Sequence, residues 1–135
     1  MVDQKLEIIT LTPGHSDARG HIVNLHESAR PYFNRPISHI AYYTSKGGCI
    51  RGNHFHPHHD EVIFLIQGKY QLFTKELDTD EKDEKIIQAG QIVICRANLV
   101  HALRHLEDSL AIAISDGGKD QKDFSDHTRA YKLIE

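Results

Sequence analysis

The chain has 135 residues, of which 39% are hydrophobic and 26% charged, and its formal net charge at pH 7 is -3. This length and composition exclude a disordered chain and predict one globular domain, residues 1–135, with a core of its own. The negative charge argues against a nucleic-acid partner held by bulk electrostatics.

Short runs of β-forming residues follow one another along the chain, separated by turn residues. The predicted strands cover residues 5–11, 21–25, 38–44, 49–56, 61–67, 69–77, 85–88, 91–95, 101–106, 110–115 and 128–134. Between them we expect a loop or helical turn over residues 29–36, a charged hairpin loop over 78–85 and a short helix or loop over 119–127. Many short strands with frequent turns predict an all-β barrel or jelly roll.

Short connections between neighbouring strands predict two hairpins. One pairs residues 61–67 with 69–77 across Gly68, and the other pairs residues 101–106 with 110–115.

Cysteine usage and apolar runs indicate the compartment. Cys49 and Cys95 form no C-x-x-C motif, so a reduced, intracellular protein is expected. The longest apolar run, residues 62–66, is too short to span a bilayer, and charged residues interrupt the N-terminal segment where a secretory signal would lie. We therefore expect a cytoplasmic protein with no membrane partner.

Residues 48–68 concentrate the chemistry of the chain. They hold His54, His56, His58 and His59, with Glu61 opening the next strand. Side chains two apart on a strand share a face, so His54 and His56 can converge if this segment is extended. We expect two adjacent antiparallel strands to bring these imidazoles and the Glu61 carboxylate together, the ligand types that divalent transition metals prefer. The alternative is a hydrogen-bonded polar cluster, and we expect His58 and His59 to be solvated in the turn.

Two further strands carry candidate site residues or contacts. On the late strand His101 shares a face with His105, so His101 can complete a set of three histidines and one glutamate. The strand over residues 61–67 is apolar on both faces, which predicts a cover on each side. In a small domain the second cover is often another subunit, and we expect a homodimer.

The spacing of these residues resembles the two motifs of the cupin superfamily. Residues 48–68 read G-x5-H-x-H-x4-E-x6-G, as in the first motif, and residues 90–105 are similar to the second. The second departs at Arg96, Asn98 and His105, where cupins usually have Pro, Gly and Asn. The resemblance implies a cupin jelly-roll β-barrel. It also implies a divalent transition metal, zinc first and iron, manganese or nickel as alternatives, whose ligands are His54, His56, Glu61 and His101.

A narrower resemblance concerns the substrate. Residues 51–56, R-G-N-H-F-H, and residues 17–20, D-A-R-G, are similar to patches of sugar-nucleotide cupins. These are dTDP-4-dehydrorhamnose 3,5-epimerases, dTDP-sugar 3,4-ketoisomerases and the cupin domain of capsular polysaccharide-synthesising reductases. The resemblance implies an epimerase or isomerase acting on a small-molecule keto-sugar such as a nucleotide sugar. The epimerases use a histidine at the position of His54 as a base without metal, whereas the capsular branch is expected to hold zinc.

Such reactions remove a proton from carbon next to a carbonyl, which requires a base. Without metal the base is His54; with metal it is Tyr42, His105 or another pocket residue, and Tyr42 or Tyr43 can line the cavity as an acid. Arg51, on the opposite parity from His54, either binds a diphosphate or forms a surface salt bridge, and Asn53 is a second candidate for substrate binding. The competing hypotheses are a metal-dependent dioxygenase or lyase on a small acid and a non-enzymatic small-ligand binder.

Overall fold

A computed structural model describes residues 2–25, 36–116 and 128–135. The predicted segments over residues 29–36, apart from Pro36, and 119–127 lie outside this part of the chain. The elements in order are α1 Val2–Lys5, β1 Leu6–Thr10, β2 His15–Asp17, β3 Gly20–Ile22, β4 Ile37–Ser45, β5 Ile50–Phe55, β6 Glu61–Gln67, β7 Lys69–Glu76, β8 Lys82–Gln88, β9 Gln91–Cys95, β10 Leu99–His105, β11 Ser109–Asp116 and β12 Arg129–Ala130. Among the described residues no helix is long and apolar enough to cross a membrane.

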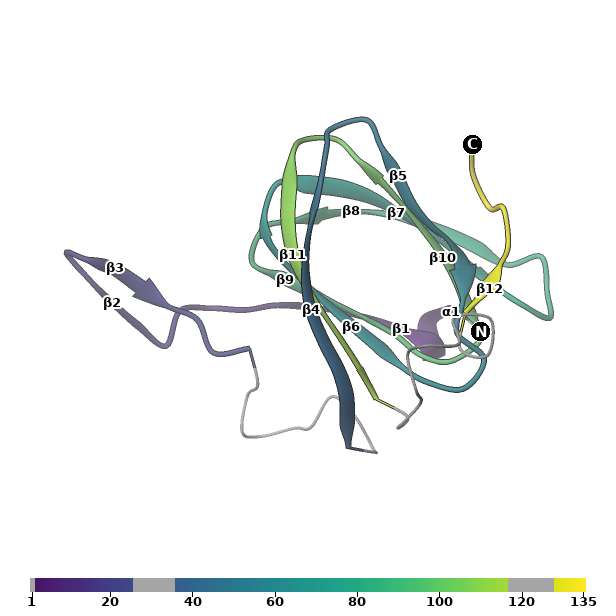
Figure 1. The fold of residues 1–135 in the computed structure, drawn as a ribbon, viewed down its shortest axis with the longest axis horizontal. Helices are drawn as coiled ribbons and strands as arrows, with labels where there is room; N and C mark the ends of the chain where they lie inside the picture. The colour runs from purple at the N-terminus through teal and green to yellow at the C-terminus, as the bar shows by residue number, and fades with distance from the viewer. Residues whose placement is uncertain (1, 26–35, 117–127) are drawn as a thin grey trace.

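Two five-stranded sheets form the body of the molecule (Figure 1). Their strand orders are β1-β9-β6-β11-β4 and β12-β5-β10-β7-β8, and β2 and β3 form a separate hairpin that projects from the body. One core cluster joins Ile63 and Leu65 of the first sheet to Tyr70, Leu72 and Leu103 of the second. The sheets therefore pack on a common core, and the prediction of an all-β jelly roll is confirmed.

Both predicted hairpins are wrong, although their strands exist. β6 pairs with β9 and β11, whereas β7 pairs with β8 and β10, so the chain changes sheet at Gly68. Gly68 has φ 100°, and a Cβ there would lie 2.2 Å from Ser109 Oγ, so only glycine fits this crossing. The chain likewise changes sheet between β10 and β11. The β7–β8 hairpin exists, but β8 starts at Lys82, inside the predicted charged loop.

The strand β6 is covered on both faces, as its sequence predicted. Ile63 and Leu65 face the common core, whereas Val62 and Phe64 belong to a second cluster on the outer side. Residues of the N-terminal segment, Leu11, Val23 and Leu25, pack on this outer cluster. Part of the second cover therefore comes from the same chain.

Candidate functional site

A bulge in β5 decides which side chains of this strand enter the site. His54 pairs with His101, but the next pair is Gly52 with Ala102, so Asn53 is an extra residue. Gly52 and Asn53 both have left-handed backbone, with φ 82° and 56°, and a Cβ on Gly52 would lie 2.7 Å from the His101 carbonyl oxygen. The extra residue puts Arg51 and His54 along the same cavity, and the opposite parity predicted for them is wrong.

Three imidazoles converge beyond the bulge. The candidate ligand atoms of His54, His56 and His101 all lie within 4.8 Å of one another. Glu61 Oε1 lies 3.6 Å from Nε2 of both His56 and His101. Glu61 comes from the facing sheet, not from a strand adjacent to β5 as predicted, because β5 and β6 belong to different sheets. The four predicted metal ligands nevertheless meet.

The His101 ring is oriented toward Glu61 by its own strand. Its Nδ1 lies 3.0 Å from the Leu99 carbonyl oxygen, which only accepts hydrogen bonds, so Nδ1 carries the proton. In the neutral ring the lone pair on Nε2 then faces the Glu61 carboxylate at 3.6 Å, beyond hydrogen-bond distance. Nε2 is buried and has no hydrogen-bond partner among the described residues. Two electron-rich groups aimed at one point fit a cation between them.

Burial and the neighbouring side chains set the protonation states of His54 and Glu61. Burial, followed by the neighbouring His101 and His56, lowers the pKa of His54 to about 3. Burial alone would raise the pKa of Glu61, but contacts with His101 and His56 outweigh it and hold that pKa well below its usual value. A neutral His54 imidazole and an ionised Glu61 carboxylate are in the protonation states that metal ligands require.

His54, Glu61 and His101 form one wall of a cavity of about 220 Å³. Apolar walls come from Ile63, Leu103 and Ala113, and Tyr43 and Arg51 complete it. Burial, followed by the negative charge of Glu61, raises the pKa of Tyr43 above its usual value, so its phenol stays protonated. The placement predicted for Tyr42 is wrong: neighbouring residues of a strand face opposite sides, and Tyr42 is 75% exposed on the outside.

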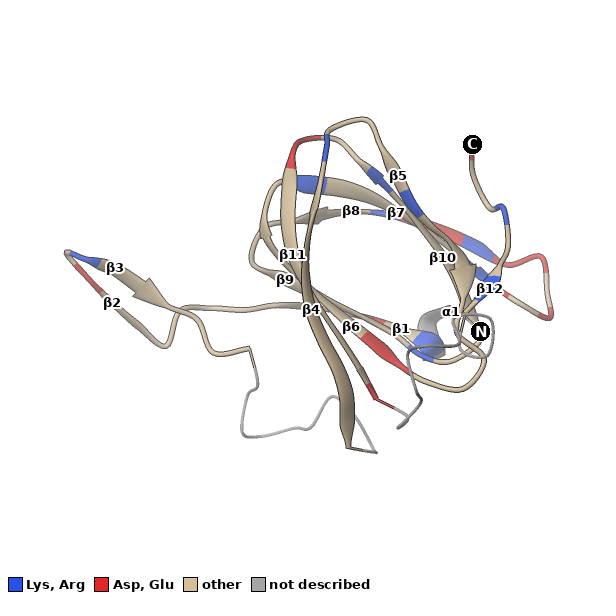
Figure 2. Ribbon diagram, viewed as in Figure 1, with Lys and Arg blue, Asp and Glu red and all other residues tan. Residues whose placement is uncertain are grey.

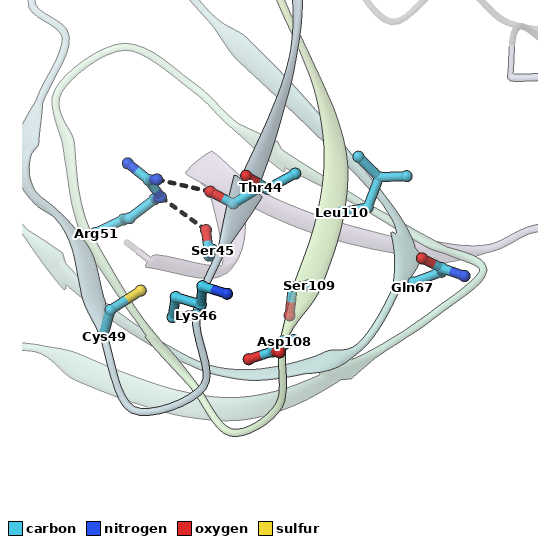
Figure 3. A pocket seen from close by; sticks show the side chains of 9 residues that line it. All are labelled: Thr44, Ser45, Lys46, Cys49, Arg51, Gln67, Asp108, Ser109 and Leu110. Carbon is cyan, nitrogen blue, oxygen red and sulfur yellow. Dashed lines mark hydrogen bonds between the residues drawn. The ribbon is translucent and has the colours of Figure 1, made fainter.

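Arg51 lines this cavity and also a wider pocket of about 660 Å³, whose lining residues Figure 3 shows. Its Nε donates to Ser45 Oγ at 2.7 Å, and its guanidinium donates to the Thr44 carbonyl oxygen at 2.7 Å (Figure 3). These acceptors are neutral, and within residues 2–25, 36–116 and 128–135 no carboxylate forms an ion pair with Arg51, whose Cζ also lies 5.4 Å from the centroid of the Tyr43 ring. The geometry therefore favours the predicted anion-binding role over a surface salt bridge.

Two other predicted residues lie elsewhere. His105 is fully buried, with its ring centroid 5.4 Å from that of Tyr70, and it does not line the cavity of the histidine cluster. Asn53 was predicted to bind substrate, but its amide bonds the backbone of Leu133 and Ile134, which directs it to the C-terminal segment. That prediction is wrong, because the bulge turns the Asn53 side chain away from the face of β5 that lines the cavity.

The turn histidines also differ from expectation. His58 is exposed, as predicted, but His59 is only 3% exposed. Its ring stacks on that of His56 with centroids 4.3 Å apart. His59 is thus a buried neighbour of the cluster, and the prediction that it is solvated is wrong.

Sequence reasoning missed two contacts of the site. Thr128 Oγ1 lies 3.1 Å from His56 Nδ1, although 72 residues separate the two along the chain. Tyr43 was considered only as an alternative to Tyr42. Neither has a local sequence signal, whereas the Gly52–Asn53 dipeptide, two residues that tolerate left-handed backbone, could have indicated the bulge.

Two packed sheets, with H-x-H and a late histidine on neighbouring strands of one and a facing glutamate on the other, define a cupin fold. Within this class, the profile of the family described as polysaccharide biosynthesis C-terminal domain matches residues 15–112, more than half of the chain. The chain belongs to this family. A comparison with curated proteins found no match.

Solved structures with the same fold are sugar-nucleotide enzymes by their names. QdtA, a sugar 3,4-ketoisomerase from Thermoanaerobacterium thermosaccharolyticum solved with TDP, has a TM-score of 0.72 at 16% identity, over 88% of this chain and 85% of QdtA. ChmJ, a 3'-monoepimerase from Streptomyces bikiniensis, has a TM-score of 0.76 at 17% identity, over 93% and 69%. RmlC, a 3,5-epimerase from Legionella pneumophila, has a TM-score of 0.75 at 12% identity, over 93% and 71%. At these identities the likeness shows the RmlC-like cupin fold.

Proposed function

We propose that the protein is an epimerase or isomerase that acts on a nucleotide-linked keto-sugar and holds a divalent metal, zinc first. The convergence of His54, His56, Glu61 and His101 supports the proposal, because His54, Glu61 and His101 line a cavity that Tyr43 also lines. Membership of a polysaccharide-biosynthesis family supports it, as does QdtA, whose structure was also solved with TDP-4-keto-6-deoxyglucose.

The four converging side chains would hold the metal, and a bound ion would supply Lewis-acid stabilisation of negative charge on a carbonyl oxygen. His54 is a poor general base at neutral pH because its pKa is lowered to about 3, and efficient bases titrate near the working pH. Its role as a metal ligand is therefore favoured over its role as the base.

Tyr43 is the group placed to move a proton. After a base has removed the proton next to the carbonyl, the protonated Tyr43 Oη would return a proton to that carbon or to its neighbour, and the conjugate acid of the base would then reprotonate the Tyr43 phenolate. Arg51, which also lines the cavity, would bind the anionic part of the substrate. The apolar side chains of Ile63, Leu103 and Ala113 limit water around the reacting carbons.

Deuterium exchange tests the proposed chemistry whichever product forms. The protein is incubated with TDP-4-keto-6-deoxyglucose in deuterated water and the sugar is followed by proton NMR. We expect deuterium to replace hydrogen on a carbon next to the carbonyl faster than in buffer alone. Exchange at the buffer rate would refute the proposal, and oxygen consumption by iron-loaded protein would favour a dioxygenase instead.

Metal analysis tests the proposed ligand set separately. Protein purified without a histidine tag should contain close to one ion per chain, and His56→Ala should lose it. A content below about one tenth per chain in folded wild-type protein would remove the metal from the proposal and leave the deuterium result as the test of the reaction.

We also propose a homodimer through the outer side of β4. Ile40 and Tyr42 are 66% and 75% exposed, and β4 carries no Lys, Arg, Asp or Glu (Figure 2). An exposed, uncharged apolar strand at a sheet edge is a typical subunit contact. Light scattering at micromolar concentration should give twice the chain mass. The cytoplasmic location stays a prediction.

A further inference from the structure

The C-terminal segment runs along the strand that carries the site histidines. β12 pairs with β5, Arg129 opposite Phe55 and Ala130 opposite His54. Beyond β12 the Tyr131 amide donates to the Asn53 carbonyl oxygen at 2.8 Å. The segment therefore follows β5 through the bulge that separates Arg51 from His54.

The Asn53 side chain fastens this segment to the bulge. Its Oδ1 accepts hydrogen bonds from the amides of Leu133 and Ile134 at 2.9 and 3.0 Å, and its Nδ2 donates to the Ile134 carbonyl oxygen at 3.0 Å. Asn53 holds left-handed backbone, which non-glycine residues seldom adopt unless surrounding contacts fix it. These bonds hold the conformation that aims Arg51 and His54 into one cavity.

The same segment reaches a second site histidine at its other end. Thr128 Oγ1 lies 3.1 Å from His56 Nδ1, and both residues are only 6% exposed. His56 Nε2 points toward Glu61. The Thr128 hydroxyl can accept the Nδ1 proton or donate to that nitrogen. When it accepts, the Nε2 lone pair is directed at the centre, which is the arrangement that the Leu99 carbonyl, an acceptor only, imposes on His101.

We infer that residues 128–134 position the site: Thr128 sets the tautomer and orientation of His56, and the Asn53 bonds hold the bulge that aims Arg51 and His54. Thr128 and Asn53 are positioning residues that act through these neighbours. The inference uses the proposed metal only as a probe, because the imidazole tautomer can be read without it.

The first experiment compares Thr128→Val, which keeps the side-chain shape but removes the hydroxyl, with Thr128→Ser, which keeps the hydroxyl. Zinc affinity is measured by competition with a chromophoric chelator. We expect Thr128→Val to weaken zinc binding about tenfold, in the range seen for residues that orient metal ligands, and Thr128→Ser to restore it. Thr10→Val, a change on an exposed residue of β1, is the matched control and should leave affinity unchanged.

The second readout is the long-range proton–nitrogen NMR spectrum of the histidine rings in metal-free protein. Wild type and Thr128→Ser should show His56 with its proton on Nδ1, and Thr128→Val should show a mixture of tautomers. An unchanged tautomer in Thr128→Val would overturn the inference for Thr128. If wild type binds no zinc, the proposed metal fails while these spectra still decide the positioning role.

The hydrogen bonds of the Asn53 side chain with Leu133 and Ile134 form a clasp between the bulge and the C-terminal segment. Asn53→Gly tests this clasp, because glycine keeps the left-handed backbone and removes the side-chain bonds. The amides of Leu133 and Ile134 should lose protection from hydrogen exchange, and the His54 ring signals should broaden or shift. Lost protection with unchanged His54 signals would show that the clasp is structural only and would overturn this part of the inference.

Discussion

The lowered pKa of His54 makes the stability of the metal-free protein depend on pH. An unfolded chain binds a proton at His54 near pH 6.5, whereas the folded protein does so only near pH 3. Between these values the unfolded state holds one more proton, so stability falls as pH falls. The slope is about 1.4 kcal/mol per pH unit, which gives a loss of about 2 kcal/mol between pH 6.5 and pH 5.

The assay is urea unfolding in the presence of a chelator at pH 7 and pH 5. His54→Asn removes the titrating group, so the loss in wild type should exceed the loss in the variant by about 2 kcal/mol. Glu61 does not enter this window, because its lowered pKa contributes stability that disappears only below its ordinary value near 4.5. His39→Asn, on an exposed position of β4, should behave as wild type. Equal losses in wild type and His54→Asn would refute the reasoning.

Three further predictions follow from the packing. Gly52→Ala should destabilise the fold by at least about 2 kcal/mol in urea unfolding, because it combines a φ of 82° with a Cβ 2.7 Å from the His101 carbonyl oxygen; wild-type stability would contradict the bulge. Tyr43→Phe should slow deuterium exchange into the keto-sugar by about a hundredfold, while Tyr42→Phe should leave it unchanged. Slow exchange in Tyr42→Phe with unchanged exchange in Tyr43→Phe would instead identify Tyr42 as the acid. Ile40→Glu should convert a dimer into a monomer by light scattering, and an unaltered mass would place the subunit contact elsewhere.

The sequence predicted most strands and the convergence of His54, His56, Glu61 and His101, but not how the chain connects the strands. The residues of β6 were predicted with their exact bounds because an apolar run between Asp60 and Gly68 has clear ends. The prediction that β6 pairs with β7 was wrong, because a hairpin and a crossing to the other sheet can have the same short connection. The two differ in strand pairings and in the close approach of Gly68 to Ser109, and both features involve residues distant in sequence.

The inward residues of two strands could not be read from alternation alone. On β4 both Tyr42 and Tyr43 are aromatic, so the pattern does not say which one enters the cavity. On β5 the alternation of side chains between the two faces is interrupted at Asn53. This one extra residue places Arg51 on the same face of the strand as His54. The contact of Thr128 with His56 had no signal, because a single hydroxyl far along the chain carries no spacing pattern.

The candidate ligands are divided between the two layers of the fold. Three imidazoles belong to the chain around one sheet, and the carboxylate of Glu61 belongs to the other. An ion bound by all four side chains would cross-link the two sheets and hold them in their relative position. A substitution at one of these four residues would therefore change both the chemistry of the site and the cohesion of the two sheets, so the two properties are coupled here.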